Sequence, residues 1–134
     1  MRKQFYEKLV VYVNRRGWWH VSPRDPNAYK KRGKFLASSY REAEFWGRPS
    51  NQTQHVCIAR PLIGDEATIE RKLFGRRVSD ENIEMEDRFK LDAKIKKAAL
   101  AKGYDSIVLM APKAFAKLKK GGKMPRSIEL NVLC

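Results

Sequence analysis

The chain has 134 residues, of which 29 are Lys or Arg and 15 are Asp or Glu, so its formal net charge at pH 7 is +14. With 43% apolar and 10% aromatic residues it can build a hydrophobic core, which excludes a disordered basic tail. No apolar run approaches the roughly 18 residues of a membrane helix, and the N-terminal apolar stretch is too short for a signal peptide. We therefore expect one cytoplasmic domain over residues 1–134.

The cysteines and histidines show no pattern typical of a metal site or a disulfide framework. Cys57 and Cys134 lie far apart in the chain. His20 and His55, the only histidines, have no ligand spacing to each other or to the acids. We therefore assign no metal ligand and no function to His55, Cys57 or Cys134.

The positive charge is concentrated in two segments. Residues 1–34 carry ten basic residues and two acids, and residues 111–126 carry six basic residues and no acid. Gly121 and Gly122 predict a flexible basic loop in the second segment. Residues 65–92, in contrast, hold nine acids and six bases. This segregation favours a polyanionic partner such as DNA, RNA or a ribonucleoprotein, while solubility alone remains the alternative explanation.

The first half of the chain predicts short elements. In chain order they are a strand or buried turn at residues 9–13, an apolar segment at 18–22, a strand at 35–37, and a helix at 40–46 capped by Ser38 or Ser39. Apolar runs of this length are typical of buried positions, so we expect the first two to contribute to the core.

The second half contains the clearest patterns. They are a strand at residues 55–60 that ends before Pro61, a helix at 89–102 closed by Gly103, a strand at 106–110, and a terminal strand at 128–133. The alternation in the last strand places Glu129 and Asn131 on one face. We expect strands to outnumber helices, and because no βαβ unit repeats, we predict a mixed α+β domain.

Three pieces of the sequence come in an order that resembles a known family. They are Trp19-His20-Val21-Ser22, the segment Gly33-Lys34-Phe35-Leu36-Ala37-Ser38 with Trp46 eleven residues after Phe35, and Glu129 on the last strand. This order resembles the ADP-ribosyltransferase family, and more closely its histidine–aromatic–glutamate branch, which includes the poly(ADP-ribose) polymerases and diphtheria-type toxins. The Phe35–Trp46 spacing is the most specific part. The segments around Pro61 and residues 103–109 also look like small bacterial and phage members.

The resemblance implies a split β-sandwich of two small sheets, with NAD bound as a substrate in the cleft. In that fold His20 would bond a ribose hydroxyl of the adenosine half, and Ser22 the nicotinamide amide. Val21 would contact NAD through its backbone, and Phe35 and Trp46 would sandwich the nicotinamide ring. Ser38, in the matched segment, is assigned to the same NAD site.

The resemblance assigns the chemistry to Glu129. Cleavage of the nicotinamide–ribose bond develops positive charge on the sugar, and a fixed carboxylate stabilises that oxocarbenium-like state more than the ground state. Nicotinamide leaves without the help of an acid. The implied activity is NAD-dependent transfer of a single ADP-ribose to a macromolecule, either nucleic acid or a protein associated with it.

The sequence departs from the family pattern at four positions. Val21 replaces a glycine, and Ala43 replaces a serine that binds the nicotinamide amide. Phe35 replaces a tyrosine but keeps the stacking face. Ser127, two residues before Glu129, is neither the Gln nor the Glu of arginine-modifying relatives. Arginine is therefore disfavoured as the acceptor.

Two other functions stay open. Water could replace the macromolecular acceptor, which would make the protein an NAD glycohydrolase. Alternatively, the chain is a non-enzymatic basic protein that binds RNA, DNA or a nucleoprotein, and His20, Phe35 and Trp46 are then packing residues.

Overall fold

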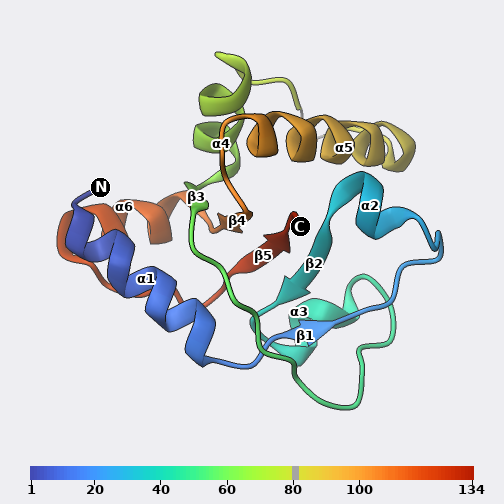
Figure 1. Cartoon of the computed structure of the whole chain (residues 1–134), viewed down its shortest axis with the longest axis horizontal. Coiled ribbons are helices and arrows are strands. Elements are labelled where there is room, and N and C mark those ends of the chain that lie inside the picture. Colours follow the sequence, from blue (N-terminus) through green and yellow to red (C-terminus); the bar gives the residue numbers. More distant parts are fainter. Residues whose placement is uncertain (80–81) are drawn as a thin grey trace.

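The computed structural model describes residues 1–79 and 82–134, and in this part of the chain it has six helices and five strands (Figure 1). The helices are α1 (Lys3–Arg15), α2 (Ala28–Arg32), α3 (Tyr40–Glu44), α4 (Glu66–Phe74), α5 (Met85–Ala101) and α6 (Pro112–Gly121). The strands are β1 (Trp19–His20), β2 (Lys34–Ala37), β3 (Pro61–Gly64), β4 (Ser106–Leu109) and β5 (Glu129–Val132).

The five strands form one mixed sheet in the order β1-β2-β5-β4-β3. Only β3 and β4 are parallel, and the other neighbours are antiparallel. The predicted α+β class is confirmed, whereas a division into two small sheets is not. The expectation that strands outnumber helices is wrong for the described residues, because α1 was predicted as a strand or turn, α6 as a loop, and α2 and α4 were not predicted.

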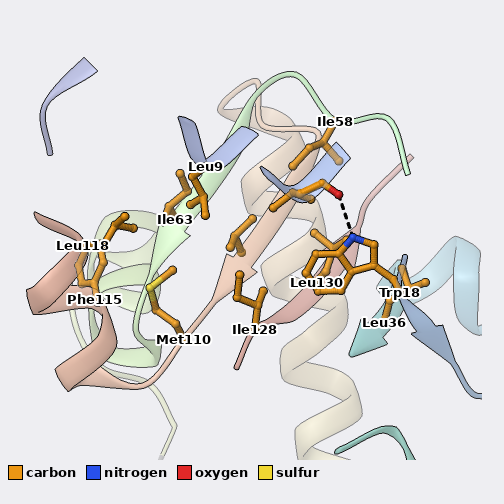
Figure 2. Packing of buried hydrophobic residues seen from close by; sticks show 12 residues of the cluster. Leu9, Trp18, Leu36, Ile58, Ile63, Met110, Phe115, Leu118, Ile128 and Leu130 are labelled. Atoms are coloured by element: carbon orange, nitrogen blue, oxygen red, sulfur yellow. Dashed lines mark hydrogen bonds between the residues drawn. The ribbon is translucent and has the colours of Figure 1, made fainter. Parts of the chain in front are cut away.

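Helices cover both faces of the sheet (Figures 1 and 2). One apolar cluster joins Leu36, Val108 and Leu130 of the sheet to α1 and α6. A second cluster joins Ile107 of the sheet to α4 and α5. Leu130 and Ile107 belong to different clusters because successive residues of a strand point to opposite faces. The chain therefore has three layers, with the sheet in the middle.

Residues 9–13, predicted as a strand or turn, lie inside α1, so that prediction is wrong. Phe5, Leu9 and Val13 are buried and recur every four residues, which is the spacing of one helix face. The apolar run around them misled the prediction because a short apolar run does not by itself distinguish a helix from a strand.

The basic segment 111–126 is not a flexible loop, because residues 112–121 form α6. Pro112 is at the first position of the helix, and Phe115 and Leu118 are buried one turn apart. Gly122 closes the helix with a φ of +68°, a left-handed conformation that favours glycine. The glycine pair was thus a helix end rather than a loop.

The strand predicted at residues 55–60 is also wrong, because strand β3 begins only at Pro61. The backbone of Ile58 is bonded by a side chain instead: the Asn14 amide accepts from Ile58 N at 2.8 Å and donates to Ile58 O at 2.9 Å. The Asp105 carboxylate accepts from the amides of Ala59 and Arg60. These side chains form hydrogen bonds with the backbone N–H and C=O groups that would bond a neighbouring strand if residues 55–60 were in the sheet.

The other predicted elements are confirmed with small changes in their ends. They are the strands β2, β4 and β5, the short helix α3 and the long helix α5. Of the two candidate caps of α3, Ser39 is the one that accepts from Glu42 N. None of the helices in residues 1–79 and 82–134 is long and apolar enough to cross a membrane.

Candidate functional site

Glu129 lies in the wall of two adjoining cavities. It is the first residue of β5 and pairs with Ala37 and Leu109, the last residues of β2 and β4, so it sits on the central strand at one end of the sheet. Its side chain is partly buried. The larger cavity, a cleft of about 380 Å³, has the size of a small-molecule site. The smaller cavity, of about 40 Å³, is lined by both Glu129 and Phe35.

The larger cleft is acidic. Its lining includes four carboxylates and one guanidinium, from Glu42, Asp65, Glu66, Glu129 and Arg77. Ser127 closes the cleft on one side, where its hydroxyl donates to Glu42 at 2.7 Å. Such a lining favours a ligand group that carries or develops positive charge.

The smaller cavity is lined by four carboxylates, of which Asp92 of α5 is one, together with Glu66, Glu70 and Glu129. Burial raises the pKa of Asp92 to about 6, although Arg88 contacts the carboxylate at 3.3 Å. Burial also raises the pKa of Glu129, and the negative charge of Asp92 raises it further. Arg88 also bonds Glu66 at 2.8 Å. One guanidinium therefore holds together acids that would otherwise repel one another.

Asn131, two residues after Glu129, lines the smaller cavity and has a buried side-chain oxygen. Its amide nitrogen donates to Arg32 O at 3.0 Å. Its side-chain oxygen has no hydrogen-bond partner among the described residues. The oxygen lies against Gly33, where a Cβ atom would be only 2.2 Å from it. Gly33 is therefore required for this arrangement, and its φ of +90° also favours glycine.

His20 is buried at the end of β1, where both ring nitrogens are engaged. Nδ1 lies 3.1 Å from Phe35 O, and Nε2 lies 2.7 Å from the Tyr29 hydroxyl. A carbonyl only accepts, so Nδ1 carries the proton and Nε2 accepts from Tyr29. Burial lowers the pKa of His20, and nearby Lys34 lowers it further. The imidazole is therefore neutral at pH 7.

Val21 lies beside Gly47, the residue after Trp46. A Cβ atom on Gly47 would be 3.0 Å from Val21 Cγ1, so Val21 packs against the residue that follows Trp46. Trp46 is 53% exposed and meets the ring of Phe45 edge to face at 5.1 Å. Trp46 thus stands at the surface beside the end of β1, and Ser22, the next residue after Val21, is exposed.

Ser38 has a structural contact. Its buried hydroxyl accepts from Ile128 N at 3.0 Å, and its backbone amide donates to Ile128 O at 3.2 Å. This double contact fixes the residue immediately before Glu129. In the structure Ser38 thus positions the carboxylate through the backbone.

The structure brings Phe35 and Glu129 to one cavity and joins His20 to the Phe35 carbonyl. It does not bring His20 beside Glu129. His20 pairs with Leu36, whereas Glu129 pairs with Ala37, the next residue of β2. The two side chains therefore point to opposite faces of the sheet. They lie on β1 and β5 with β2 between them, a separation of about 10 Å at the backbone. A ligand that meets both must span two strands.

Asn131 was predicted from the sequence to share the face of Glu129, whereas Tyr29, Arg88 and Asp92 were not predicted to be part of this region. Asp92 had a usable signal, since it follows Leu91 and precedes Ile95 on the buried side of α5. An acid at such a position must be paired, protonated or functional. Tyr29 had no signal, because only the tertiary structure brings its hydroxyl to His20.

The raised pKa of Asp92 predicts a stability effect that depends on pH. As pH rises from about 4 to 6, the Asp92 carboxyl ionises in the unfolded chain before it ionises in the folded one. The free energy of unfolding therefore falls over this range, by up to about 3 kcal/mol. We expect Asp92→Asn to remove this loss. Urea unfolding at pH 4.5 and 7.5 measures the free energy of unfolding. The difference between variant and parent should shift in favour of the variant at the higher pH. Asp87→Asn, an exposed change in the same helix, is the control, and a pH-independent difference would contradict the assignment.

Comparisons with protein-family models, curated proteins and solved structures found no match to this chain.

Proposed function

We propose that the protein is an NAD-dependent mono-ADP-ribosyltransferase with Glu129 as its catalytic residue. The observation that carries the proposal is the position of Glu129, partly buried between an acidic cleft and the cavity lined by Phe35. The neighbouring strands of the same antiparallel group, β1 and β2, carry His20 and Phe35. Three of the residues matched to the family, His20, Phe35 and Glu129, thus lie on adjacent strands, with His20 and Glu129 on opposite faces of the sheet.

The acidic cleft suits the cationic nicotinamide–ribose end of NAD, where the bond breaks, and not its anionic diphosphate. The nicotinamide ring of NAD is cationic, and when its bond to ribose breaks, the bonding electrons move to the ring nitrogen and neutral nicotinamide leaves. Positive charge then resides on the ribose. The Glu129 carboxylate accepts a hydrogen bond from a ribose hydroxyl and stabilises that charge. The acceptor then forms the new bond to the sugar carbon and gives up its proton.

Tyr29 modifies the role proposed for His20. Because the Tyr29 hydroxyl already occupies Nε2, a ribose hydroxyl can bond His20 only by replacing it. Tyr29 is 41% exposed, so its side chain has space to move away. The bond from Nδ1 to Phe35 O keeps the ring in place during such an exchange.

Tyr29→Phe is therefore expected to increase the affinity for NAD. The variant removes the hydroxyl that competes for Nε2, and one hydrogen bond of this kind corresponds to about a two- to tenfold change in the dissociation constant. Titration calorimetry with NAD measures it. Tyr40→Phe is a matched control, since Tyr40 has a similar exposure and contacts Trp19 through its ring rather than its hydroxyl. Weaker binding by Tyr29→Phe would mean that the tyrosine itself contacts the ribose.

The proposal includes an ADP-ribosyltransferase-like arrangement in which two small sheets enclose NAD. It also places the nicotinamide ring between Phe35 and Trp46. The exposure of Trp46 supports this role, since an aromatic ring that is half open to solvent can still stack on a ligand. A crystal structure with NAD would test both points.

The function is tested with labelled NAD. NAD should raise the melting temperature of the chain, because a ligand stabilises the state that binds it. Incubation with a cell lysate should then transfer label to a macromolecule. Release of free ADP-ribose without labelled macromolecule would assign a glycohydrolase instead. If NAD neither stabilises the chain nor is cleaved, the enzyme proposal fails, and a basic nucleic-acid-binding protein remains.

A further inference from the structure

Most of the excess positive charge lies in two segments at opposite ends of the chain. Residues 1–16, which are the first part of the basic segment 1–34, and residues 111–126 together contain eleven Lys or Arg and one acid, Glu7, a net charge of +10. The whole chain has a net charge of +14. The other 102 residues thus carry only about +4 between them. The charge is segregated along the sequence rather than spread evenly.

The fold places these two segments side by side. Helix α1 and helix α6 pack on the same face of the sheet, where Leu9 and Val13 share an apolar cluster with Phe115 and Leu118 (Figure 2). Gly122, at the end of α6, lies against the Phe5 ring, which a Cβ atom there would meet at 2.4 Å. Figure 1 shows α1 and α6 as neighbours. The two basic segments therefore form one surface, the α1–α6 layer.

The lysines of this layer face solvent and are available to a partner. Lys113, Lys117 and Lys120 are exposed and form no ion pair with any residue in the described ranges. Among the described residues the one acid, Glu7, forms an ion pair only with Lys3, at 4.0 Å and with both side chains largely exposed. Almost nothing within the layer neutralises its charge.

Most aromatic side chains of the layer are turned inward, and Tyr12, which is partly buried, packs against the core and accepts a hydrogen bond from Arg16 at 2.6 Å. Phe5 and Phe115 are buried, and the Tyr6 hydroxyl donates to Pro61 O across the core. Proteins that bind single strands generally offer exposed aromatic rings on which bases stack. The α1–α6 layer offers ammonium groups instead, which contact phosphates and carry no sequence information.

We propose that the α1–α6 layer binds the phosphate backbone of double-helical nucleic acid without sequence preference. Binding at this surface does not require NAD, because the layer covers the face opposite to the one on which Glu129 lies. The two surfaces meet at one place: Pro112, the first residue of α6, lines the larger cleft beside Glu129. If the proposed transferase activity holds, a duplex on the layer brings its neighbouring groups to that cleft.

The test compares two triple variants that remove the same charge from different faces. The α6 variant changes the layer and combines Lys113→Gln, Lys117→Gln and Lys120→Gln. The α5 variant changes exposed positions of α5 and combines Lys90→Gln, Lys94→Gln and Lys97→Gln. Fluorescence anisotropy with labelled 20-base-pair DNA and RNA duplexes measures affinity from 0.05 to 0.3 M salt. We expect the α6 variant to bind about tenfold or more weakly at 0.1 M salt. We also expect the slope of log K against log salt concentration to be smaller in magnitude for this variant, by up to about 2.7. The α5 variant should stay close to the parent.

Several results would overturn the proposal. They are equal weakening by both variants, no effect of the α6 variant, or tighter binding to a single-stranded oligonucleotide than to either duplex. Binding to phosphatidylserine vesicles but not to the duplexes would assign the layer to a membrane surface instead. Thermal stabilisation by NAD, measured on the same α6 variant, keeps this test separate from the enzyme proposal, because the two properties can fail independently.

Discussion

Glu129→Gln is expected to abolish NAD cleavage, with a rate loss of about a thousandfold or more, equivalent to about 4 kcal/mol of transition-state stabilisation. The amide keeps the size of the side chain and removes the negative charge that faces the developing cation. Binding of NAD should change much less, because the charge acts mainly in the transition state. Single-turnover release of labelled nicotinamide separates the two effects.

The stability of the variant distinguishes this loss from unfolding. The pKa of Glu129 is raised by burial and by Asp92, so ionising the carboxyl costs free energy in the folded state. Glu129→Gln should therefore melt at the same or a higher temperature than the parent at pH 7.5. Glu86→Gln, an exposed change at the start of α5, should leave cleavage unaltered. Retention of label transfer by Glu129→Gln would remove the assigned role.

Trp18→Ala should produce the largest loss of stability among single substitutions in the core, about 3–5 kcal/mol. Trp18 is fully buried within the cluster that joins α1, the sheet and α6. Its indole nitrogen also donates to Val13 O at 2.9 Å, near the end of α1 (Figure 2). Removing the ring empties the centre of this cluster and leaves that carbonyl without its partner.

Thermal melts followed by far-UV circular dichroism measure the effect, which corresponds to a fall of about 10 °C or more. Trp18→Phe keeps most of the volume and loses the hydrogen bond, so it should cost about 1–3 kcal/mol. Trp46→Ala removes the same ring type from a half-exposed position and should cost less than about 1 kcal/mol. Equal losses for Trp18→Ala and Trp46→Ala would show that the core assignment is wrong.

The two basic segments illustrate how far the sequence alone could go. Counting charges predicted a polyanionic partner, but the Gly121-Gly122 pair was interpreted as a loop. The structure shows a helix packed beside α1, so the charges form one rigid surface. Charge is a property of composition, whereas the coincidence of residues 1–16 and 111–126 depends on a long-range contact that no local pattern contains.

The candidate site shows the same division. The alternation of the last strand correctly placed Glu129 and Asn131 on one face, because a period of two is a local property of a strand. The register of β1 and β5 against β2, however, decides which side chains share a face. It places Glu129 on the face of Phe35, with which it lines a cavity, and His20 on the other face. Tyr29 and Asp92 enter the region from α2 and α5. Their approach depends on helix packing.

The sequence by itself determined the α+β class, the long helix α5 and the strands β2, β4 and β5, because each depends on a repeat within a few residues. Only the tertiary structure decided that residues 9–13 are helical and that residues 55–60 are not a strand. In the first case the buried face of α1 required partners on the sheet. In the second, Asn14 and Asp105 bonded backbone groups from far along the chain, and such distant partners override local preference.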